Sequence, residues 1–194
     1  MFNKKANFMV STMTDRHELI DYLAQGHSVS YLHFWGHTQK AEAIDKSCLS
    51  QWFYAPFTLE QITYLTAEHY MMAQKARLFN DSARLAEILA CRSPQEAKQF
   101  GRMVENFENS VWQQHCFDYV VQGNLGKFSQ NPALYEFLLS TGEQILVEAS
   151  PRDRIWGIGM GASNPEATNP KLWRGQNLLG FALMQVRAKL KEIA

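Results

Sequence analysis

Apolar residues recur mostly at helical spacing along this chain, and only a few short runs break the pattern. The spacing predicts helices in LIDYLA, in TAEHYMMAQKARLF, over Asn109 to Lys127, over Pro132 to Thr141 and in the closing NLLGFALMQVRAKL. The β-branched and aromatic run SVSYLHFW and the short run ILVEA predict strands, and FTL and ITY predict a small hairpin. We therefore expect a helix-rich α+β domain with few, short strands.

Polar residues mark where several of these helices begin. Asp15 followed by Glu18 resembles a helix cap, and Thr66 precedes the next helical run. Either Asn80 or Asp81 is expected to start a short helix, and Ser93-Pro94-Gln95-Glu96 combines a cap, a first-turn proline and an acid three residues later. Residues 1–13 show no such signal and are expected to be a mobile lead-in.

Composition narrows the class of protein. The chain has 194 residues, with 46% hydrophobic and 20% charged, which suits one globular domain. Nineteen basic residues balance nineteen acidic ones, so broad binding to DNA or to a membrane surface is not expected. This balance does not exclude a local anion site. No apolar stretch is long enough for a transmembrane helix or a signal peptide. Three widely spaced cysteines, Cys48, Cys91 and Cys116, indicate a reducing, cytoplasmic setting.

The helix after Thr66 carries the first candidate site residues. Glu68, Met72 and Lys75 share one face of this helix, so a carboxylate and an amine point the same way. The competing interpretation is a solvated charge pair on the helix surface. His69 has no second histidine at metal-binding spacing, and we expect no metal site.

The segment VEASPRDRIWGIGMG crowds charged, aromatic and backbone-permissive residues together. Glu148 ends a predicted strand, Asp153 lies between two arginines, and Trp156 offers a flat face for a heteroaromatic ring. The glycines allow backbone to approach a ligand, but no helix follows at once, so this is a poor dinucleotide motif. A cavity wall and a tight surface turn under a tryptophan remain equal alternatives.

A third candidate segment, WRGQN, precedes the closing helix. Free N–H groups at a helix start attract anions, and Arg174 would strengthen that attraction. Asn177 has the default interpretation of a helix cap.

Three longer motifs, in order, resemble the NADAR, or YbiA-like, family. They are SCLSQWFYAPFTLEQITYLTAEHYMMAQKARLF, LLSTGEQILVEASPRDRIWGIGMG and LWRGQNLLGFALMQVR, and their spacing agrees over roughly residues 30 to 190. The resemblance implies a compact, helix-rich α+β fold of one domain. We expect residues 1–28 to form an N-terminal extension with one helix, and residues 29–194 to form the YbiA-like domain.

Members of this family are described as N-glycosidases, so the resemblance implies a hydrolase of N-glycosyl bonds. In the YbiA-like branch the bond joins a pyrimidine amine to ribose 5-phosphate in early riboflavin intermediates. Other members remove ADP-ribose from guanine bases, which gives the alternative expectation of an ADP-ribosylated nucleotide or nucleic acid as substrate. By motif, the resemblance places functional positions at Glu68, Lys75, Glu148, Asp153, Trp156 and Asn177.

One motif departs from the family pattern. Many members read LSNFYPSPF, whereas this chain has LSQWFYAPF, with Gln51 in place of a shorter amide and Tyr54-Ala55 in place of a proline-containing turn. The departure leaves the enzyme class unchanged and bears on substrate detail. HFWGH resembles the end of an extension found in some members.

Breaking a ribosyl C–N bond builds positive charge on the sugar and requires a carboxylate, a bound water and a way to protonate or hold the leaving base. Glu148 or Asp153 is expected to position water, with Trp156 stacked on the pyrimidine. Lys75 has two open roles: it holds a phosphate or ribose hydroxyl, or it attacks C1 as an amine. Glu68 would then move protons. Candidates to receive the phosphate are Arg152, Arg154 and Arg174.

Two non-enzymatic alternatives are a sensor that binds an ADP-ribose-like ligand and a helical interaction module without a pocket. A protein that only binds a phosphorylated ligand has no use for three nearby carboxylates, at positions 68, 148 and 153. Their presence argues against the sensor. The partner we expect is thus a small phosphoribosylated pyrimidine, with no cofactor and no membrane partner.

Overall fold

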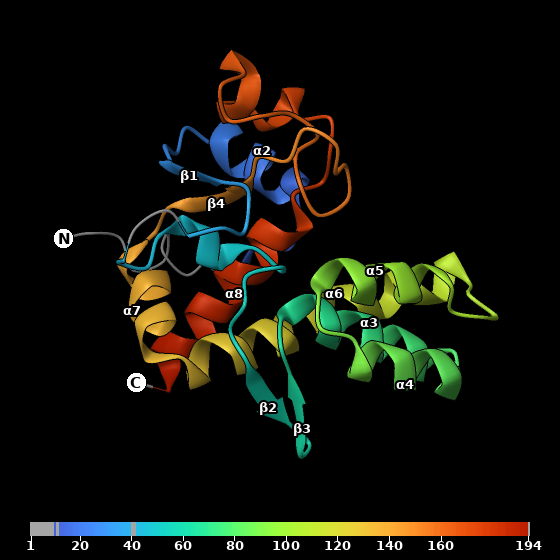
Figure 1. The fold of residues 1–194 in the computed structure, drawn as a ribbon. Coiled ribbons are helices and arrows are strands. Elements are labelled where there is room, and N and C mark those ends of the chain that lie inside the picture. Colours follow the sequence, from blue (N-terminus) through green and yellow to red (C-terminus); the bar gives the residue numbers. More distant parts are fainter. Residues whose placement is uncertain (1–9, 11, 40–41, 194) are drawn as a thin grey trace.

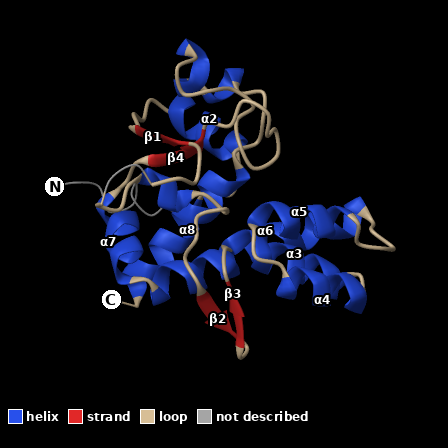
Figure 2. Ribbon diagram, in the orientation of Figure 1, coloured by secondary structure: helices blue, strands red, loops and turns tan. Residues whose placement is uncertain are grey.

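The computed structural model describes residues 10, 12–39 and 42–193, in which helices dominate and strands are short (Figure 2). This confirms the expected helix-rich α+β class. Helix α8 lies between a pair of strands, β1 and β4, and the long helix α6 (Figure 1). The elements are α2 (Arg16–Ala24), β1 (Tyr31–Phe34), η1 (Lys46–Leu49), β2 (Phe57–Leu59), β3 (Ile62–Tyr64), α3 (Ala67–Leu78), α4 (Ser82–Ala90), α5 (Pro94–Arg102), α6 (Asn109–Gln130), α7 (Pro132–Ser140), β4 (Ile145–Glu148), η2 (Pro165–Thr168), η3 (Pro170–Leu172) and α8 (Leu178–Glu192).

Four helices begin where the polar signals predict. The side chains of Asp15, Thr66, Asp81 and Ser93 each accept a hydrogen bond from a main-chain N–H in the first turn of α2, α3, α4 and α5. Glu96 completes a capping box at the start of α5. Each cap satisfies an N–H that has no partner inside its own helix, which fixes where the helix starts.

The predicted hairpin is present and turns at two residues. Strands β2 and β3 pair antiparallel, with Leu59 opposite Ile62. Glu60 and Gln61 between them have φ of 51° and 64°, as a two-residue turn with positive φ at both positions requires.

The two other strands form a parallel pair that positions the site. Tyr31 lies opposite Ile145 and Phe34 opposite Glu148. Because parallel strands point the same way, the segments that leave β1 and β4 emerge at the same edge. Helix α8 packs against β4, α6 packs against α8, and α3 packs against α6, so a chain of contacts links the strand pair to the helices that follow β3.

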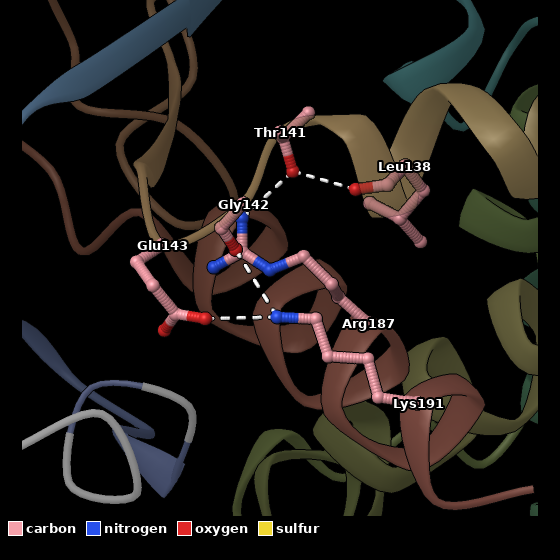
Figure 3. A network of polar contacts seen from close by, with 6 residues as sticks. All are labelled: Leu138, Thr141, Gly142, Glu143, Arg187 and Lys191. Carbon is pink, nitrogen blue, oxygen red and sulfur yellow. Dashed lines mark hydrogen bonds and ion pairs between the residues drawn. The ribbon is translucent and has the colours of Figure 1, made fainter. Parts of the chain in front are cut away.

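A polar network anchors the start of β4 to α8 (Figure 3). The fully buried Arg187 donates to Thr141 Oγ1 at 2.7 Å, and Thr141 Oγ1 donates to the Leu138 carbonyl at 2.6 Å. Nearby, Lys191 Nζ lies 2.8 Å from Glu143 Oε1. These contacts tie the turn between α7 and β4 to the last helix and so fix the strand that ends at Glu148.

The N-terminal helix shares the core of the rest of the chain. Leu19 and Tyr22 are buried in it, and Arg16 Nη1 donates to the Trp173 carbonyl at 2.8 Å. Most of the predicted mobile lead-in lies outside the described residues, but Val10 and Met13 are described and are buried. A separate extension over residues 1–28 stays a prediction. None of the helices in the described ranges is long and apolar enough to span a bilayer.

Candidate active site

A cavity of about 880 Å³ opens where α3 and α5 meet the segments that follow η1, β1 and β4. Its volume lies in the range of ordinary ligand pockets. Residues from six separate parts of the chain contribute to its wall, including Trp35-Gly36-His37 after β1 and Arg152 to Trp156 after β4. The predicted VEASPRDRIWGIGMG segment is therefore a cavity wall and not only a surface turn.

Three carboxyl groups converge on this cavity from two distant parts of the chain. Glu68 comes from the first turn of α3, Glu148 from the end of β4, and Asp153 from the loop after β4. Glu68 is only 4% exposed, so its interpretation as a solvated surface charge is wrong. Glu148 Oε2 is buried and has no hydrogen-bond partner among the described residues.

Burial moves the pKa of two of these acids close to neutrality. For Glu68, burial raises the pKa to about 7, while Lys98 and a hydrogen bond from the Trp52 side chain oppose the rise. For Glu148, burial and then the neighbouring charges of Asp153 and Glu68 raise the pKa to about 8. Two carboxyl groups that exchange protons near neutral pH are suited to general acid and base work.

Asp153 shapes the loop that carries Trp156. Its Oδ1 accepts hydrogen bonds from the main-chain N–H groups of Ile155 and Trp156, at 2.9 and 2.8 Å. Gly157 packs so closely on β4 that a Cβ there would lie 2.8 Å from the Glu148 carbonyl oxygen. Trp156 is thereby held at the cavity wall, where its ring can stack on a heterocycle.

Lys75 faces the same cavity from α3, as its shared face with Glu68 predicts. Its Nζ donates to the Gly101 carbonyl at 2.7 Å and lies 3.9 Å from the centre of the Phe107 ring. Burial lowers the pKa of Lys75, and the nearby Arg102 lowers it further. An amine with a lowered pKa is neutral, and hence nucleophilic, over more of the physiological pH range.

Helix α5 reaches Lys75 because Gly101 has no side chain. A Cβ at position 101 would lie 2.0 Å from Met72 Sδ, well inside contact distance. Glycine therefore allows α5 to approach α3 and places its carbonyl within reach of the lysine.

Of the four residues predicted to bind substrate, two line the cavity and two do not. Trp156 and Arg154 are part of its wall. Arg174 is exposed and lies outside the lining, so the predicted phosphate contact finds no geometric support there.

Asn177 is fully buried, and its default interpretation as a side-chain cap of α8 is wrong. Its side chain makes no cap hydrogen bond; Oδ1 accepts from the Glu148 N–H and Nδ2 donates to the Leu146 carbonyl, both at 2.9 Å. These bonds, with φ of 59°, hold the end of β4. Asn177 thus positions Glu148 from behind, and a direct substrate contact has no support from the cavity wall.

Several wall residues were not anticipated. Trp52 and Trp112 add aromatic faces, and Lys98 and Arg102 add cations from α5. The four-residue spacing of Lys98 and Arg102 is visible in the sequence, but such pairs are common on exposed helices. Only the packing of α5 on α3 turns them toward the cavity. In the part of the chain that the structure describes, no three His, Cys, Asp or Glu side chains are arranged to hold a metal ion.

Comparisons with known proteins agree with this fold. The family model described as the NADAR domain matches residues 33–191. An N-glycosidase of Acanthamoeba polyphaga mimivirus is 46% identical over 143 residues, which cover 71% of this chain and 84% of that protein. The chloroplastic riboflavin biosynthesis protein PYRR of Zea mays is 36% identical over 138 residues, 68% of this chain but only 20% of that protein.

A solved structure shares the architecture. The NMR structure of the E. coli protein YbiA superposes with a TM-score of 0.69 at 26% identity, covering 86% of this chain and 88% of that one. Together with the family match over residues 33–191 and the identity to the mimiviral relative, this shared fold leads to one conclusion: this chain belongs to the NADAR domain family.

Proposed function

We propose that this protein is an N-glycosidase that hydrolyses the C–N bond between a pyrimidine amine and ribose 5-phosphate in early riboflavin intermediates. The observation that carries the proposal is the convergence of Glu68, Glu148 and Asp153 on one cavity beside Trp156. The names of the mimiviral and maize relatives support the reaction and the pathway, respectively. The free thiols of the chain's three cysteines fit action in the cytoplasm.

The two carboxyl groups with raised pKa divide the proton transfers between them. We assign to Glu148 the role of positioning water and accepting its proton, because Glu148 Oε2 has no hydrogen-bond partner in the described part of the chain. Asp153 Oδ1, by contrast, already accepts hydrogen bonds from two N–H groups. Glu68 supplies the proton that the leaving amine takes as the bond to C1 breaks. With pKa values of about 7 for Glu68 and about 8 for Glu148, the pair holds one proton between these pH values, and the higher pKa places it on Glu148. These roles therefore require the proton to pass from Glu148 to Glu68 when the substrate binds, so that Glu148 can accept a proton from water.

Lys75 fits the role of nucleophile in this reaction. Its amine would attack C1 as the bond to the pyrimidine amine breaks, and the opened sugar would stay attached as a Schiff base until water releases it. The lowered pKa of Lys75 and its place on the cavity wall support this role.

Borohydride added during turnover should reduce the Schiff base and leave a ribose adduct on Lys75, detected by mass spectrometry. Lys75→Arg should form no adduct and lose at least a hundredfold in kcat, of the order expected for a missing nucleophile. Full activity of Lys75→Arg, with no adduct on the wild type, would show that water attacks C1 directly.

ADP-ribosylated guanine is the second candidate substrate. The cavity of about 880 Å³ has room for more than one heterocycle, and its cations come from both α5 and the loop after β4, as two linked phosphates would need. Neither feature is required by a single phosphoribosyl group.

Release of free base decides between these substrates. Purified protein is incubated with a phosphoribosylaminopyrimidine and, separately, with ADP-ribosylated guanosine, and released base is quantified by chromatography. We expect release from the pyrimidine substrate, absent in Glu148→Gln. Release only from the guanosine substrate would move the assignment to the second candidate, and release from neither would reject the N-glycosidase proposal.

A further inference from the structure

Helix α5 presents a pair of basic side chains to the cavity, Lys98 and Arg102. They are one helical turn apart, so they lie on the same face of α5, and both belong to the cavity wall. Lys98 is half-buried, and its Nζ lies 5.7 Å from the centre of the Trp52 ring. The pair therefore borders the same space as the carboxyl groups.

These cations act on the acids without being paired to them. Lys98 lowers the pKa of both Glu68 and Glu148, and Arg102 lowers that of Glu68. Within residues 12–39 and 42–193, however, neither cation is within ion-pair distance of a carboxylate. Their donors are thus available to a ligand anion that enters between the helix and the acids.

The backbone under this pair is a regular helix, unlike that under the other cavity arginines. Helix α5 begins with a complete capping box and packs through Gly101 directly onto Met72 of α3. Arg152 and Arg154 instead extend from an irregular loop; like Arg102, both are exposed. A helix holds two donors at a constant separation, which favours binding of one compact anion over loose contacts from a loop.

We propose that Lys98 and Arg102 form the subsite for the phosphate monoester of the substrate, and that the arginines after β4 do not. The inference rests on the proposed function, because it concerns the same cavity. It orients the ligand: the phosphate lies at Lys98 and Arg102, and C1 of the sugar lies between Lys75 and Glu148. A substrate without a phosphate would lose most of its affinity and keep its chemistry.

Binding of ribose 5-phosphate tests this subsite without requiring turnover. Isothermal titration calorimetry on the full chain compares ribose 5-phosphate with ribose, for the wild type and for Lys98→Gln and Arg102→Gln. Each substitution should weaken ribose 5-phosphate binding about tenfold, as loss of one charge-assisted hydrogen bond does. The weak binding of ribose should not change.

Arg92→Gln is the matched control, because Arg92 is an exposed arginine just before α5 and outside the cavity wall. It removes the same net charge and should bind ribose 5-phosphate like the wild type. Wild-type affinity in both α5 variants, with a loss in Arg152→Gln or Arg154→Gln, would overturn the assignment. So would a wild type that binds ribose 5-phosphate no better than ribose. Base release measured in parallel shows separately whether the glycosidase proposal holds.

Discussion

Two regions of this protein bury ionisable groups: the cavity, and a seam between α6 and the segment after Asp45. The two regions differ in the hydrogen-bond partners that they provide for these groups. The seam consists of Cys48, Ser50, Gln51, Asn124 and Lys127. There the fully buried Lys127 donates to the carbonyls of Cys48 and Ser50, at 2.6 and 2.8 Å, and Asn124 Nδ2 donates to Gln51 Oε1 at 2.6 Å. In the cavity, by contrast, the atom left without a partner in the described ranges belongs to an ionisable group, Glu148 Oε2, whereas in the seam it is the uncharged Asn124 Oδ1.

Both regions shift a pKa toward neutrality. Burial lowers the pKa of Lys127 to about 7, much as it raises that of Glu68 to about 7. A shifted pKa therefore does not by itself identify a catalytic group. A catalytic candidate differs in having a polar atom of an ionisable group that faces an open cavity and has no hydrogen-bond partner within the protein. Lys127, by contrast, donates its hydrogen bonds to the backbone beside Trp52.

The largest effect should come from Glu148→Gln. The amide keeps the shape of the side chain but cannot accept a proton, so we expect kcat to fall by about 10²- to 10⁴-fold. The melting temperature at pH 7 should stay close to that of the wild type, because a neutral amide replaces a carboxyl group whose pKa is raised to about 8. Initial rates measure the expected fall in kcat, and a thermal melt measures the melting temperature. A variant that retains near-normal rates would remove Glu148 from the proposed chemistry.

Stability should depend on pH in opposite directions in the two regions. In the unfolded chain Glu148 ionises near its ordinary pKa of 4.5, whereas in the folded protein it keeps its proton up to about 8. The unfolded state thus loses the proton first, so the free energy of unfolding falls between these pH values, by the order of a few kcal/mol, and levels off above them. Lys127 has the opposite sign, with stability rising from about pH 7 toward 10.5.

Urea unfolding at pH 5 and pH 8 measures this dependence. Glu148→Gln has no such proton to lose and should show a smaller fall between the two pH values than the wild type. Equal falls in both proteins would mean that Glu148 ionises normally in the folded state.

Lys127→Met should break the seam. Two buried carbonyl oxygens lose their donor, so we expect the free energy of unfolding to fall by about 1–3 kcal/mol. Lys189→Met, on the exposed side of α8, is the control and should change it by less than about 0.5 kcal/mol. A Lys127→Met protein more stable than the wild type would mean that burying the ammonium costs more than its two hydrogen bonds contribute.

The smallest effect should come from Gly101→Ala, which separates α5 from α3 and moves the carbonyl that holds Lys75. The flexible end of Met72 can shift, so the cost should be about 1 kcal/mol in unfolding free energy. A second substitution, Met72→Ala, should make the alanine at 101 better tolerated than it is alone. A double-mutant cycle with no coupling would show that the two helices do not depend on this contact.

Helix starts could be predicted from sequence because they are local. Asp15, Thr66 and Ser93 cap N–H groups only two or three residues away, so spacing alone identifies them. Asn177 was misread for the same reason: a local rule favoured a cap, but β4 offered a better partner for its side chain.

The cavity could be predicted only in part. The shared face of Glu68 and Lys75 follows from helix periodicity, and the Glu148 to Trp156 segment follows from its motif. The parallel pairing of β1 with β4 and the orientation of α5 depend on contacts between distant segments, which no local pattern encodes. Lys98 and Arg102 were therefore missed, although their spacing is plain in the sequence.

Phe34 pairs with Glu148, and Asn177 accepts a hydrogen bond from the Glu148 N–H. These contacts also affect the stage of folding at which the site forms. Contacts between segments so far apart in the chain form slowly, since a long loop must close first. During synthesis, α3 through α7 can gather on the ribosome while the strand that ends at Glu148 still lacks its support from α8. Ligand recognition is consequently among the last properties the nascent protein gains, and truncation before Asn177 would abolish it while sparing most of the helices.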